Sequence, residues 1–242
     1  MEYTNKFNEW LAGLIDGDGY FLLSQQGYTS LEITMDIRDS YCLYIIKTKY
    51  GGSVKLRSGN QSMRYRLHHK IGLLLLLNDV NGLLRHSIRL LQYNKVCNKY
   101  EIGLITNKLL TYNNNWMGGF FDAAGTIIIN TITKQLSISI SQKTQELLIP
   151  LKELYGGEIY IDRSSNTFKW DLTKREDILK LQDNYLKNNY LYSKKRNRIF
   201  LINKFFFIKD LENQNNIFVE KIWIDFWKKW KNYEEDKDMY QE

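Results

Sequence analysis

The order of apolar and polar residues predicts a repeating series of helices and strands. Residues 31–37 alternate between apolar and polar side chains, which is the two-residue period of a half-buried strand. Residues 7–15 place apolar side chains at helical spacing instead. Extended over the first hundred residues, these patterns predict helices at 5–17, 39–50, 70–78 and 83–99 and strands at 19–26, 30–37, 53–58 and 63–69.

The chain contains an internal duplication. A shift of about 105 residues aligns 31–82 with 136–187 without a gap, and it places Tyr50-Gly51-Gly52 on Tyr155-Gly156-Gly157. The second copy is predicted to have helices at 143–155, 174–188 and 194–211 and strands at 126–132, 136–142, 157–163 and 167–172. Two such copies predict an α+β fold with internal pseudo-twofold symmetry.

The domain organisation follows from the two copies. We expect a first repeat at 1–99, a linker at 100–114, a second repeat at 115–211 and a C-terminal helical extension at 212–242. The extension includes an amphipathic helix at about 217–233, whose aromatic residues at helical spacing are interpreted as a docking face: Trp223, Phe226, Trp227 and Trp230.

Composition narrows the class of protein. The chain has 242 residues, of which 43% are hydrophobic and 25% charged, as in ordinary globular proteins. Two cysteines, Cys42 and Cys97, exclude a disulfide framework and a paired-cysteine zinc site. No apolar run approaches the ~20 residues that span a bilayer, and the first residues resemble neither a signal nor a transit peptide. Abundant Asn, Lys, Ile and Tyr favour an A/T-rich genome, organellar genomes among them.

A net charge of +7 is compatible with a polyanionic partner. Arg64, Arg66 and His68 share one face of a predicted strand, and Lys55 and Arg57 lie on its neighbour. Arg163 and Lys169 are candidates on the corresponding hairpin of the second copy. Such a basic sheet face is either an ordinary solvated surface or a face that enters a groove of a duplex; the duplication and the charge leave the two interpretations balanced.

Each copy begins with a helix that contains small residues and ends in an acidic turn. The first reads Leu-Ala-Gly-Leu-Ile-Asp-Gly-Asp-Gly over 11–19, and the second Met-Gly-Gly-Phe-Phe-Asp-Ala-Ala-Gly over 117–125. Small side chains would let the two helices pack closely, and the candidates for that interface are Ala12, Gly13, Gly118 and Gly119. Acids at the helix ends would then meet, and paired carboxylates can hold a divalent metal ion against a scissile phosphate.

These motifs and the duplicated body resemble the LAGLIDADG proteins of the single-chain, two-repeat kind, encoded within fungal mitochondrial group I introns. The resemblance implies that each repeat folds as αββαββα, that the motif helices form the interface, and that the two sheets form a saddle over DNA. It also implies that the second acid of each motif helps to bind Mg²⁺ and to hydrolyse both strands. Some members act instead, or in addition, as maturases that help their own intron RNA to splice.

The resemblance assigns the catalytic acid of the first motif to Asp18, whereas the equivalent position of the second motif is Ala124. The first acids, Asp16 and Asp122, match positions that are structural in the family. A methyl group cannot coordinate a hard cation. We therefore expect a weakened Mg²⁺ site at Asp18, completed by backbone carbonyls such as those of Gly17 or Ala123.

Two functions follow from these expectations. The favoured one is a group I intron RNA maturase that has lost or impaired DNA cleavage; the alternative is a site-specific double-strand homing endonuclease. Ala124 is then either natural decay or an engineered inactivation. A transcriptional or structural DNA binder on the same saddle is a third class. We expect intron RNA or double-stranded DNA as the partner and no association with a membrane. We also expect a monomer that is located in the mitochondrial matrix. Whether the chain is an enzyme stays open.

Overall fold

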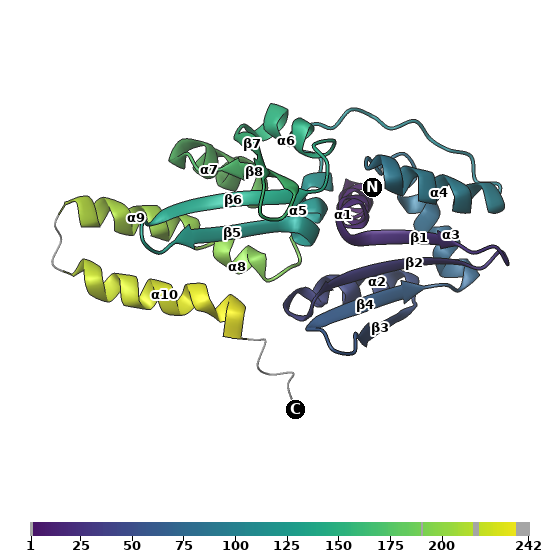
Figure 1. The fold of residues 1–242 in the computed structure, drawn as a ribbon, viewed down its shortest axis with the longest axis horizontal. Helices are drawn as coiled ribbons and strands as arrows, with labels where there is room; N and C mark the ends of the chain where they lie inside the picture. Colours follow the sequence, from purple (N-terminus) through teal and green to yellow (C-terminus); the bar gives the residue numbers. More distant parts are fainter. Residues whose placement is uncertain (1, 190, 215–217, 236–242) are drawn as a thin grey trace.

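The computed structural model describes residues 2–189, 191–214 and 218–235, with side chains described between 6 and 232. It has two halves on either side of a central pair of helices, α1 and α5 (Figure 1). The first half contains α1 (Glu2–Asp18), β1 (Gly19–Leu23), β2 (Thr29–Asp36), the short η1 (Ile37–Asp39), α2 (Tyr41–Tyr50), β3 (Ser53–Leu56), β4 (Ser62–Leu67), α3 (Lys70–Asp79) and α4 (Ser87–Lys99).

The second half repeats this plan and extends it. It contains α5 (Trp116–Ala124), β5 (Gly125–Asn130), β6 (Gln135–Gln142), α6 (Leu148–Tyr155), β7 (Glu158–Asp162), β8 (Thr167–Leu172), α7 (Arg175–Leu181), η2 (Gln182–Leu186), α8 (Lys195–Ile199), α9 (Ile202–Asn213) and α10 (Val219–Glu235). The antiparallel sheets have the orders β1-β2-β4-β3 and β5-β6-β8-β7. The predicted α+β fold with two pseudo-symmetric repeats is confirmed.

The alternation of apolar residues sets which face of each sheet is buried. In the first sheet Ile33 on β2 lies opposite Tyr65 on β4, and both are fully buried, whereas their neighbours Thr34 and Arg64 lie on the other face. The core therefore lies beneath one face of each sheet, on the side covered by helices such as α2 and α6. The other face of each sheet carries mostly polar residues, such as Thr34 and Arg64 in the first sheet and Ser137 and Ser139 in the second.

The Tyr-Gly-Gly sequence ends a helix in both repeats. It ends α2 and α6, and the glycines that follow have positive φ, 77° at Gly51 and 79° at Gly156, which side chains disfavour. The two glycine carbonyls accept hydrogen bonds from equivalent aromatic residues, Tyr65 Oη at 3.0 Å and Trp170 Nε1 at 2.7 Å. The duplication therefore extends to individual buried hydrogen bonds.

Two predicted helices begin later than the pattern indicated. The helix expected from 143 begins at Leu148, which places Pro150 in the first turn, where no intrahelical donor is lost. The turn before it carries Glu146, whose carboxylate accepts from the backbone N–H of Ser87 at 2.9 Å. The helix expected from 83 begins at Ser87, and the two backbone N–H groups before it, those of Arg85 and His86, donate to Asp16.

Two other predicted helices are interrupted. The helix expected at 174–188 changes from α7 to the wider π-turn η2, and the one expected at 194–211 breaks between α8 and α9. The buried amide of Gln182, at the start of η2, donates to the carbonyl of Ile199, at the end of α8, at 2.8 Å. The two interruptions therefore lie against each other and share this hydrogen bond.

The remaining segments support the two halves. Residues 101–114 connect them without a helix or strand. In α10, Trp223, Phe226 and Trp230 are buried, and Phe205 of α9 packs against the first two. Among the described helices, none combines the length and the apolar character needed to cross a membrane.

Candidate active site and nucleic-acid interface

The two motif helices touch through their backbones. A Cβ atom placed on Gly13 would lie 1.9 Å from the carbonyl oxygen of Trp116, and one on Gly119 would lie 1.7 Å from that of Trp10. Any side chain at either glycine would force the helices apart. Of the other small residues, Ala12 is buried, and the backbone N–H of Gly118 donates to the hydroxyl of Tyr185 at 3.0 Å.

The first acid of each motif bonds to the opposite repeat. Asp16 and Asp122 are buried, and each accepts a hydrogen bond from an indole across the axis, Trp116 Nε1 to Asp16 at 2.7 Å and Trp10 Nε1 to Asp122 at 2.8 Å. Each carboxylate therefore lies near the end of its own helix and receives a donor from the other helix.

The same two acids also hold the loops of their own repeats. Asp16 accepts from the backbone N–H groups of Arg85 and His86, and Asp122 accepts from those of Tyr192 and Ser193. Burial raises the pKa of Asp16 to about 7 and raises that of Asp122 as well, whereas these donors favour the charged form. Their lone pairs are used within the fold, so these acids position the helix ends rather than face a substrate.

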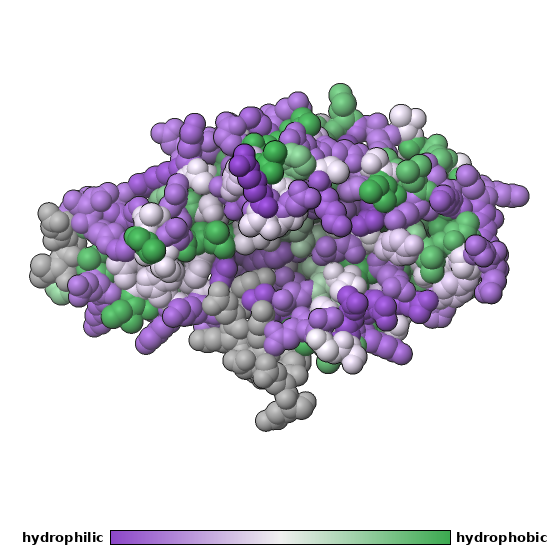
Figure 2. Space-filling view, in the orientation of Figure 1, coloured by the Kyte–Doolittle hydropathy of each residue, from purple (hydrophilic) through white to green (hydrophobic). Residues whose placement is uncertain are grey.

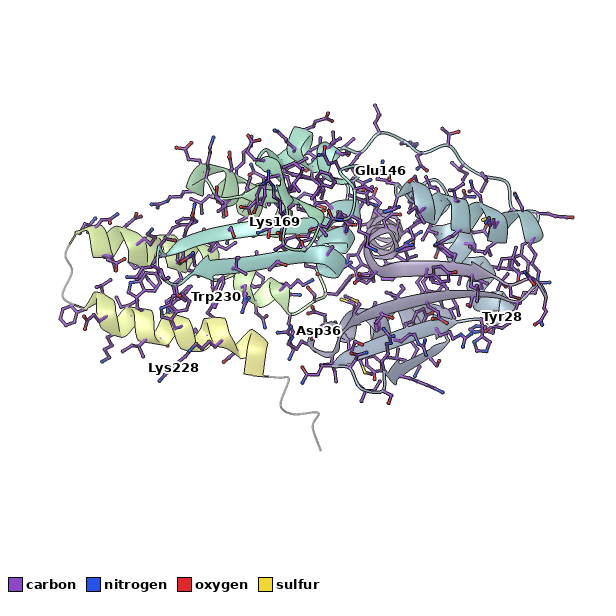
Figure 3. The ribbon with its side chains drawn as sticks, viewed as in Figure 1. Tyr28, Asp36, Glu146, Lys169, Lys228 and Trp230 are labelled. Carbon is purple, nitrogen blue, oxygen red and sulfur yellow. The ribbon has the colours of Figure 1, made fainter. Side chains whose placement is uncertain are left out.

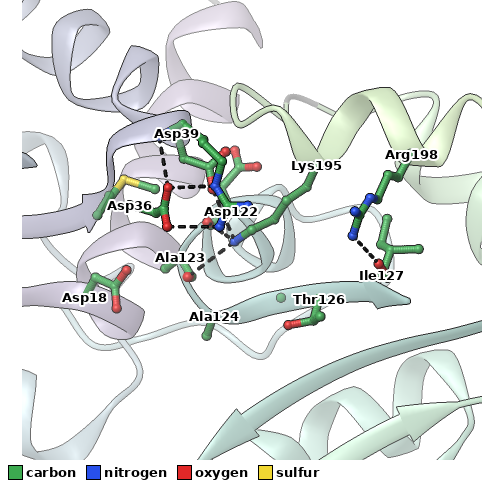
Figure 4. Close-up of a pocket in the computed structure, with 13 residues that line it drawn as sticks. Asp18, Asp36, Asp39, Asp122, Ala123, Ala124, Thr126, Ile127, Lys195 and Arg198 are labelled. Atoms are coloured by element: carbon green, nitrogen blue, oxygen red, sulfur yellow. Dashed lines mark hydrogen bonds and ion pairs between the residues drawn. The ribbon is translucent and has the colours of Figure 1, made fainter. Parts of the chain in front are cut away.

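Asp18 and Ala124 lie at the ends of α1 and α5 and line one cavity of about 300 Å³ (Figure 4). Asp18 is half-buried, and burial raises the pKa of its carboxyl group to about 7, opposed by the positive charges of Lys195 and Arg89. The opposite position carries only a methyl group. The cavity thus contains one of the two acids that the resemblance implies.

Lys195, at the start of α8, was not singled out from the sequence. Its ammonium donates to the carbonyls of Asp122 at 2.6 Å and Phe121 at 3.3 Å and lies 3.4 Å from that of Ala123 (Figure 4). A cation at a helix C-terminus is favoured by the exposed carbonyls there. The run of basic residues at 194–198 was the available signal, but only the fold shows that one of them reaches α5.

A divalent ion would find few ligands on the Ala124 side. The Ala123 carbonyl, one of its candidate ligands, already faces the Lys195 ammonium. Within the described residues, no group of three or more His, Cys, Asp or Glu side chains converges to hold a metal. Gly17 packs so closely that a Cβ there would lie 2.4 Å from Cβ of Ala123. The residues present therefore do not complete the symmetric pair of metal sites.

The open face of the first sheet is basic. Arg64 and Arg66 lie on β4 opposite Lys55 and Ser53 of β3, and Arg57 and His68 follow the ends of these strands as exposed residues. Glu32 on β2 offsets part of this charge, because it pairs with Arg66 at 3.1 Å and Arg64 at 3.5 Å. The sheet thus brings together all five candidate residues that the sequence assigned to this repeat.

The open face of the second sheet is much less basic. Lys169 on β8 lies opposite Tyr160 of β7 and 3.9 Å from Asp171 (Figure 3), and Arg163 is exposed in the turn between β7 and β8. Hydroxyl and apolar side chains occupy the neighbouring positions, among them Thr126 and Ile128 on β5. The two halves of the saddle therefore share a fold and differ in charge.

Comparison with known proteins gives a consistent result. The profile described as LAGLIDADG endonuclease matches residues 11–100 and 117–206. The probable intron-encoded endonuclease aI2 of Debaryomyces hansenii is 41% identical over 93% of this chain, and the intron-encoded RNA maturase bI4 of Saccharomyces cerevisiae is 43% identical over 94%. The chain spans only 38% and 37% of those two proteins. The intron-encoded DNA endonuclease ai2b of Dictyostelium discoideum is 35% identical over 94% of this chain and 90% of its own length.

Solved structures share the fold at low sequence identity. The meganuclease I-SmaMI bound to uncleaveable DNA superposes with a TM-score of 0.68 and 18% identity, over 90% of this chain and 97% of that one. The same meganuclease bound to uncleaved DNA in the presence of calcium ions gives 0.59 and 16%, over 92% and 97%. These two structures carry DNA on the fold described above.

Proposed function

Because the chain belongs to the LAGLIDADG endonuclease family, we propose that it is an intron-encoded RNA maturase, a protein that binds its group I intron RNA and assists splicing, and that it no longer cleaves both strands of DNA. The observation that carries this proposal is that Asp18 and Ala124, the equivalent positions of the two motifs, line the same cavity. The fold and the basic sheet are retained, whereas one of two symmetric acids is gone. The relative named an RNA maturase, at 43% identity, supports the same conclusion.

The loss of one carboxylate limits the chemistry. Bound Mg²⁺ polarises a phosphoryl oxygen and lowers the pKa of water, which requires ligands that fix its position. In this chain Asp18 and the carbonyl of Gly17 or Ala123 would hold such an ion weakly and on one side. Lys195 lies beside the cavity and forms an ion pair with Asp39 at 3.9 Å, and an ammonium group does not replace the lost carboxylate as a metal ligand.

The binding role needs no chemistry. Lys55, Arg57, Arg64, Arg66 and His68 on the first sheet, with Arg163 and Lys169 on the second, would contact phosphates and release counterions. Because the two repeats already supply a pseudo-twofold saddle, one chain suffices, and we propose that it acts as a monomer. We also propose that the chain is encoded by a mitochondrial gene and acts in the matrix, and the intron-encoded relatives support such an origin.

The second candidate is a site-specific DNA endonuclease. It is favoured by Asp18, which is retained, and by the Dictyostelium discoideum relative named a DNA endonuclease, of which this chain covers 90%. In that case Ala124 is a substitution that inactivated the enzyme. A codon for Asp or Glu at position 124 of the source gene would show this.

Two parallel assays distinguish the candidates. The cognate precursor RNA is spliced in vitro with and without the protein, and a DNA duplex that contains the intron-insertion site is incubated with the protein and Mg²⁺. We expect faster splicing and no double-strand breaks. Mg²⁺-dependent double-strand cutting by the unmodified chain, with no effect on splicing, would overturn the proposal in favour of the endonuclease.

A further inference from the structure

A second cavity lies between β5 and α10, at the edge of the second sheet, and of the saddle positions named above it includes only Ile128. It has a volume of about 680 Å³, and we call it the β5–α10 groove. Its lining includes four basic residues and two tryptophans: Lys134, Arg198, Lys228, Lys231, Trp227 and Trp230. Within the described residues, the first repeat ends at α4 and has no counterpart of α10. The groove is therefore an addition to the duplicated saddle.

The inner wall of the groove consists of buried, closely packed side chains. Trp230 is buried on the side of α10 that faces β5 (Figure 3), and it stacks on Phe226 with ring centroids 5.7 Å apart. The Arg198 guanidinium lies 4.8 Å from the Trp230 ring centre and donates to the carbonyl of Ile127 on β5 at 2.9 Å. These contacts tie α10 to the edge of the sheet without using the outer wall.

The outer wall offers an aromatic surface and exposed positive charge. Trp227 is half-buried and stacks on Trp223 at 5.9 Å, so part of its indole remains available. Lys228 and Lys231 are exposed, and within the described residues no acid forms an ion pair with either. Asp225 of the same helix pairs with Lys204 at 2.7 Å and Lys229 at 3.4 Å instead, and it does not line the groove.

The remaining charges do not neutralise this wall. Lys134 forms an ion pair with Glu212, which offsets the charge of Lys134. The charges of Lys228 and Lys231 are not offset by this pair. Of the residues that the structure describes, no acid lines the groove, so the net charge of its lining is positive. The face of the molecule in Figure 2 is hydrophilic for the most part, with apolar residues near α10 among the exceptions.

We propose that the β5–α10 groove binds a single-stranded segment of RNA, with one base against Trp227 and the adjacent phosphates on Lys228 and Lys231. An aromatic side chain beside cations is the usual platform for a single strand, because unpaired bases can stack on it. A duplex keeps its bases stacked within the helix, so it cannot offer a base to Trp227. This inference rests on the proposed RNA partner and assigns it a surface at the edge of the second sheet, apart from the basic residues of the saddle.

The test compares two charge reversals on one helix. Lys228→Glu with Lys231→Glu alters the groove, and Lys221→Glu with Lys229→Glu makes the same change of charge at lysines that do not line it. Affinity is measured for a labelled 12-nucleotide single-stranded RNA and for a labelled DNA duplex as a function of salt, on full-length proteins whose thermal melting is recorded. We expect the groove pair to weaken RNA binding at least tenfold and to lower the log–log salt slope by roughly 1.4, at about 0.7 per phosphate. The control pair should change RNA affinity less than threefold.

A measurement on the unmodified chain tests the proposal even if the variants fail to fold. RNA that carries 4-thiouridine is photocrosslinked to the wild-type protein, and we expect the crosslinked peptide to contain Trp227. Equal losses of RNA affinity for both pairs, an equal loss of duplex affinity, or crosslinks confined to the two sheets would each overturn the proposal. The splicing assay separates this result from the proposed function. If the wild-type protein assists splicing but the groove variants bind RNA normally, only the groove proposal is refuted. If the groove binds RNA but the protein does not speed splicing, only the maturase proposal is refuted.

Discussion

Trp10 donates its indole N–H to the buried carboxylate of Asp122, 112 residues away and in the other repeat, at 2.8 Å. Trp116 makes the same contact with Asp16 at 2.7 Å, so the pair is reciprocal about the pseudo-twofold axis. Asp122 thus serves the interface and the loop at 192–193. The first acid of the second motif therefore has a structural role that does not depend on the residue at position 124.

Removal of one indole donor should weaken the interface. Trp10→Phe keeps an aromatic ring and leaves Asp122 with one fewer donor, and a hydrogen bond to a charged group contributes about 1.5–3 kcal/mol. We expect a loss of that size in the free energy of unfolding, measured with urea. Trp170→Phe is the matched control, because its indole donates to a neutral carbonyl at 2.7 Å and should cost about 0.5–1.5 kcal/mol. Equal costs for the two variants would contradict the special role of the carboxylate.

The glycines between the motif helices should tolerate no side chain. In Gly13→Ala the new methyl group would overlap the Trp116 carbonyl, so the helices must separate. Overpacking of a core costs at least about 1–3 kcal/mol, and we expect a cost above that range because the obstacle is backbone. Gly13→Leu should prevent stable folding. Gly103→Ala is the control, since nothing lies within 4 Å of its added Cβ. Wild-type melting of Gly13→Ala would refute the close approach of the two helices.

Restoration of the missing acid should restore DNA chemistry if recognition has been kept. Ala124→Asp places a second carboxylate in the cavity that Asp18 lines, and the helices already hold that position. We expect Mg²⁺-dependent nicking or cleavage of the insertion-site duplex, measured on gels. Asp18→Asn in the same background should abolish it. If Ala124→Asp binds the duplex without cutting it, the Lys195 ammonium is the next group to remove, because it occupies the adjacent carbonyls.

Asp18 should make stability depend on pH. Burial raises the pKa of its carboxyl group to about 7 in the folded state from 3.8, so the folded protein holds this proton more tightly. Its contribution is fully present below a pH of about 4 and is lost as the pH rises through about 7. Asp18→Asn removes this loss and should be more stable than wild type at about pH 8 but not at about pH 4. Three pKa units set an upper limit of about 4 kcal/mol, and we expect roughly 1–2 because the group is half-exposed.

The control for this prediction is Asp183→Asn, at an exposed carboxyl group that pairs with Lys187. Its effect on the free energy of unfolding should be small at both pH values. A difference between Asp18→Asn and wild type that stays the same at the acidic and the alkaline pH would show that Asp18 titrates normally.

The unequal charge of the two sheets should appear in duplex binding. Alanine at Arg64 or Arg66 should reduce affinity and lower the salt slope by about 0.9 for each phosphate that the variant no longer neutralises. Lys169→Ala should do less, because among the described residues Asp171 pairs with Lys169 alone, whereas Arg64 and Arg66 share the single carboxylate of Glu32. Fluorescence anisotropy over a range of salt concentrations measures both quantities. If no substitution in either sheet changes affinity, the duplex binds elsewhere.

Local patterns determined much of this protein in advance. The alternation at 31–37 identified β2 and its buried face, and the repeated Tyr-Gly-Gly identified the ends of α2 and α6. The two motifs at 11–19 and 117–125, through their resemblance to the LAGLIDADG family, indicated the fold and predicted that Ala124 stands in place of an acid. These features depend on residues two to four positions apart, whose side chains share a face whatever the rest of the chain does.

The tertiary structure decided what depends on distant residues. Asp16 holds the loop before α4 from about 70 residues earlier, because it accepts hydrogen bonds from two backbone N–H groups of that loop. Lys195 reaches the carbonyls of α5 from about 72 residues away, and α10 forms a groove only because it lies beside β5. No periodicity along the chain encodes such contacts, because they arise when separate elements pack and each buried polar group must find a partner.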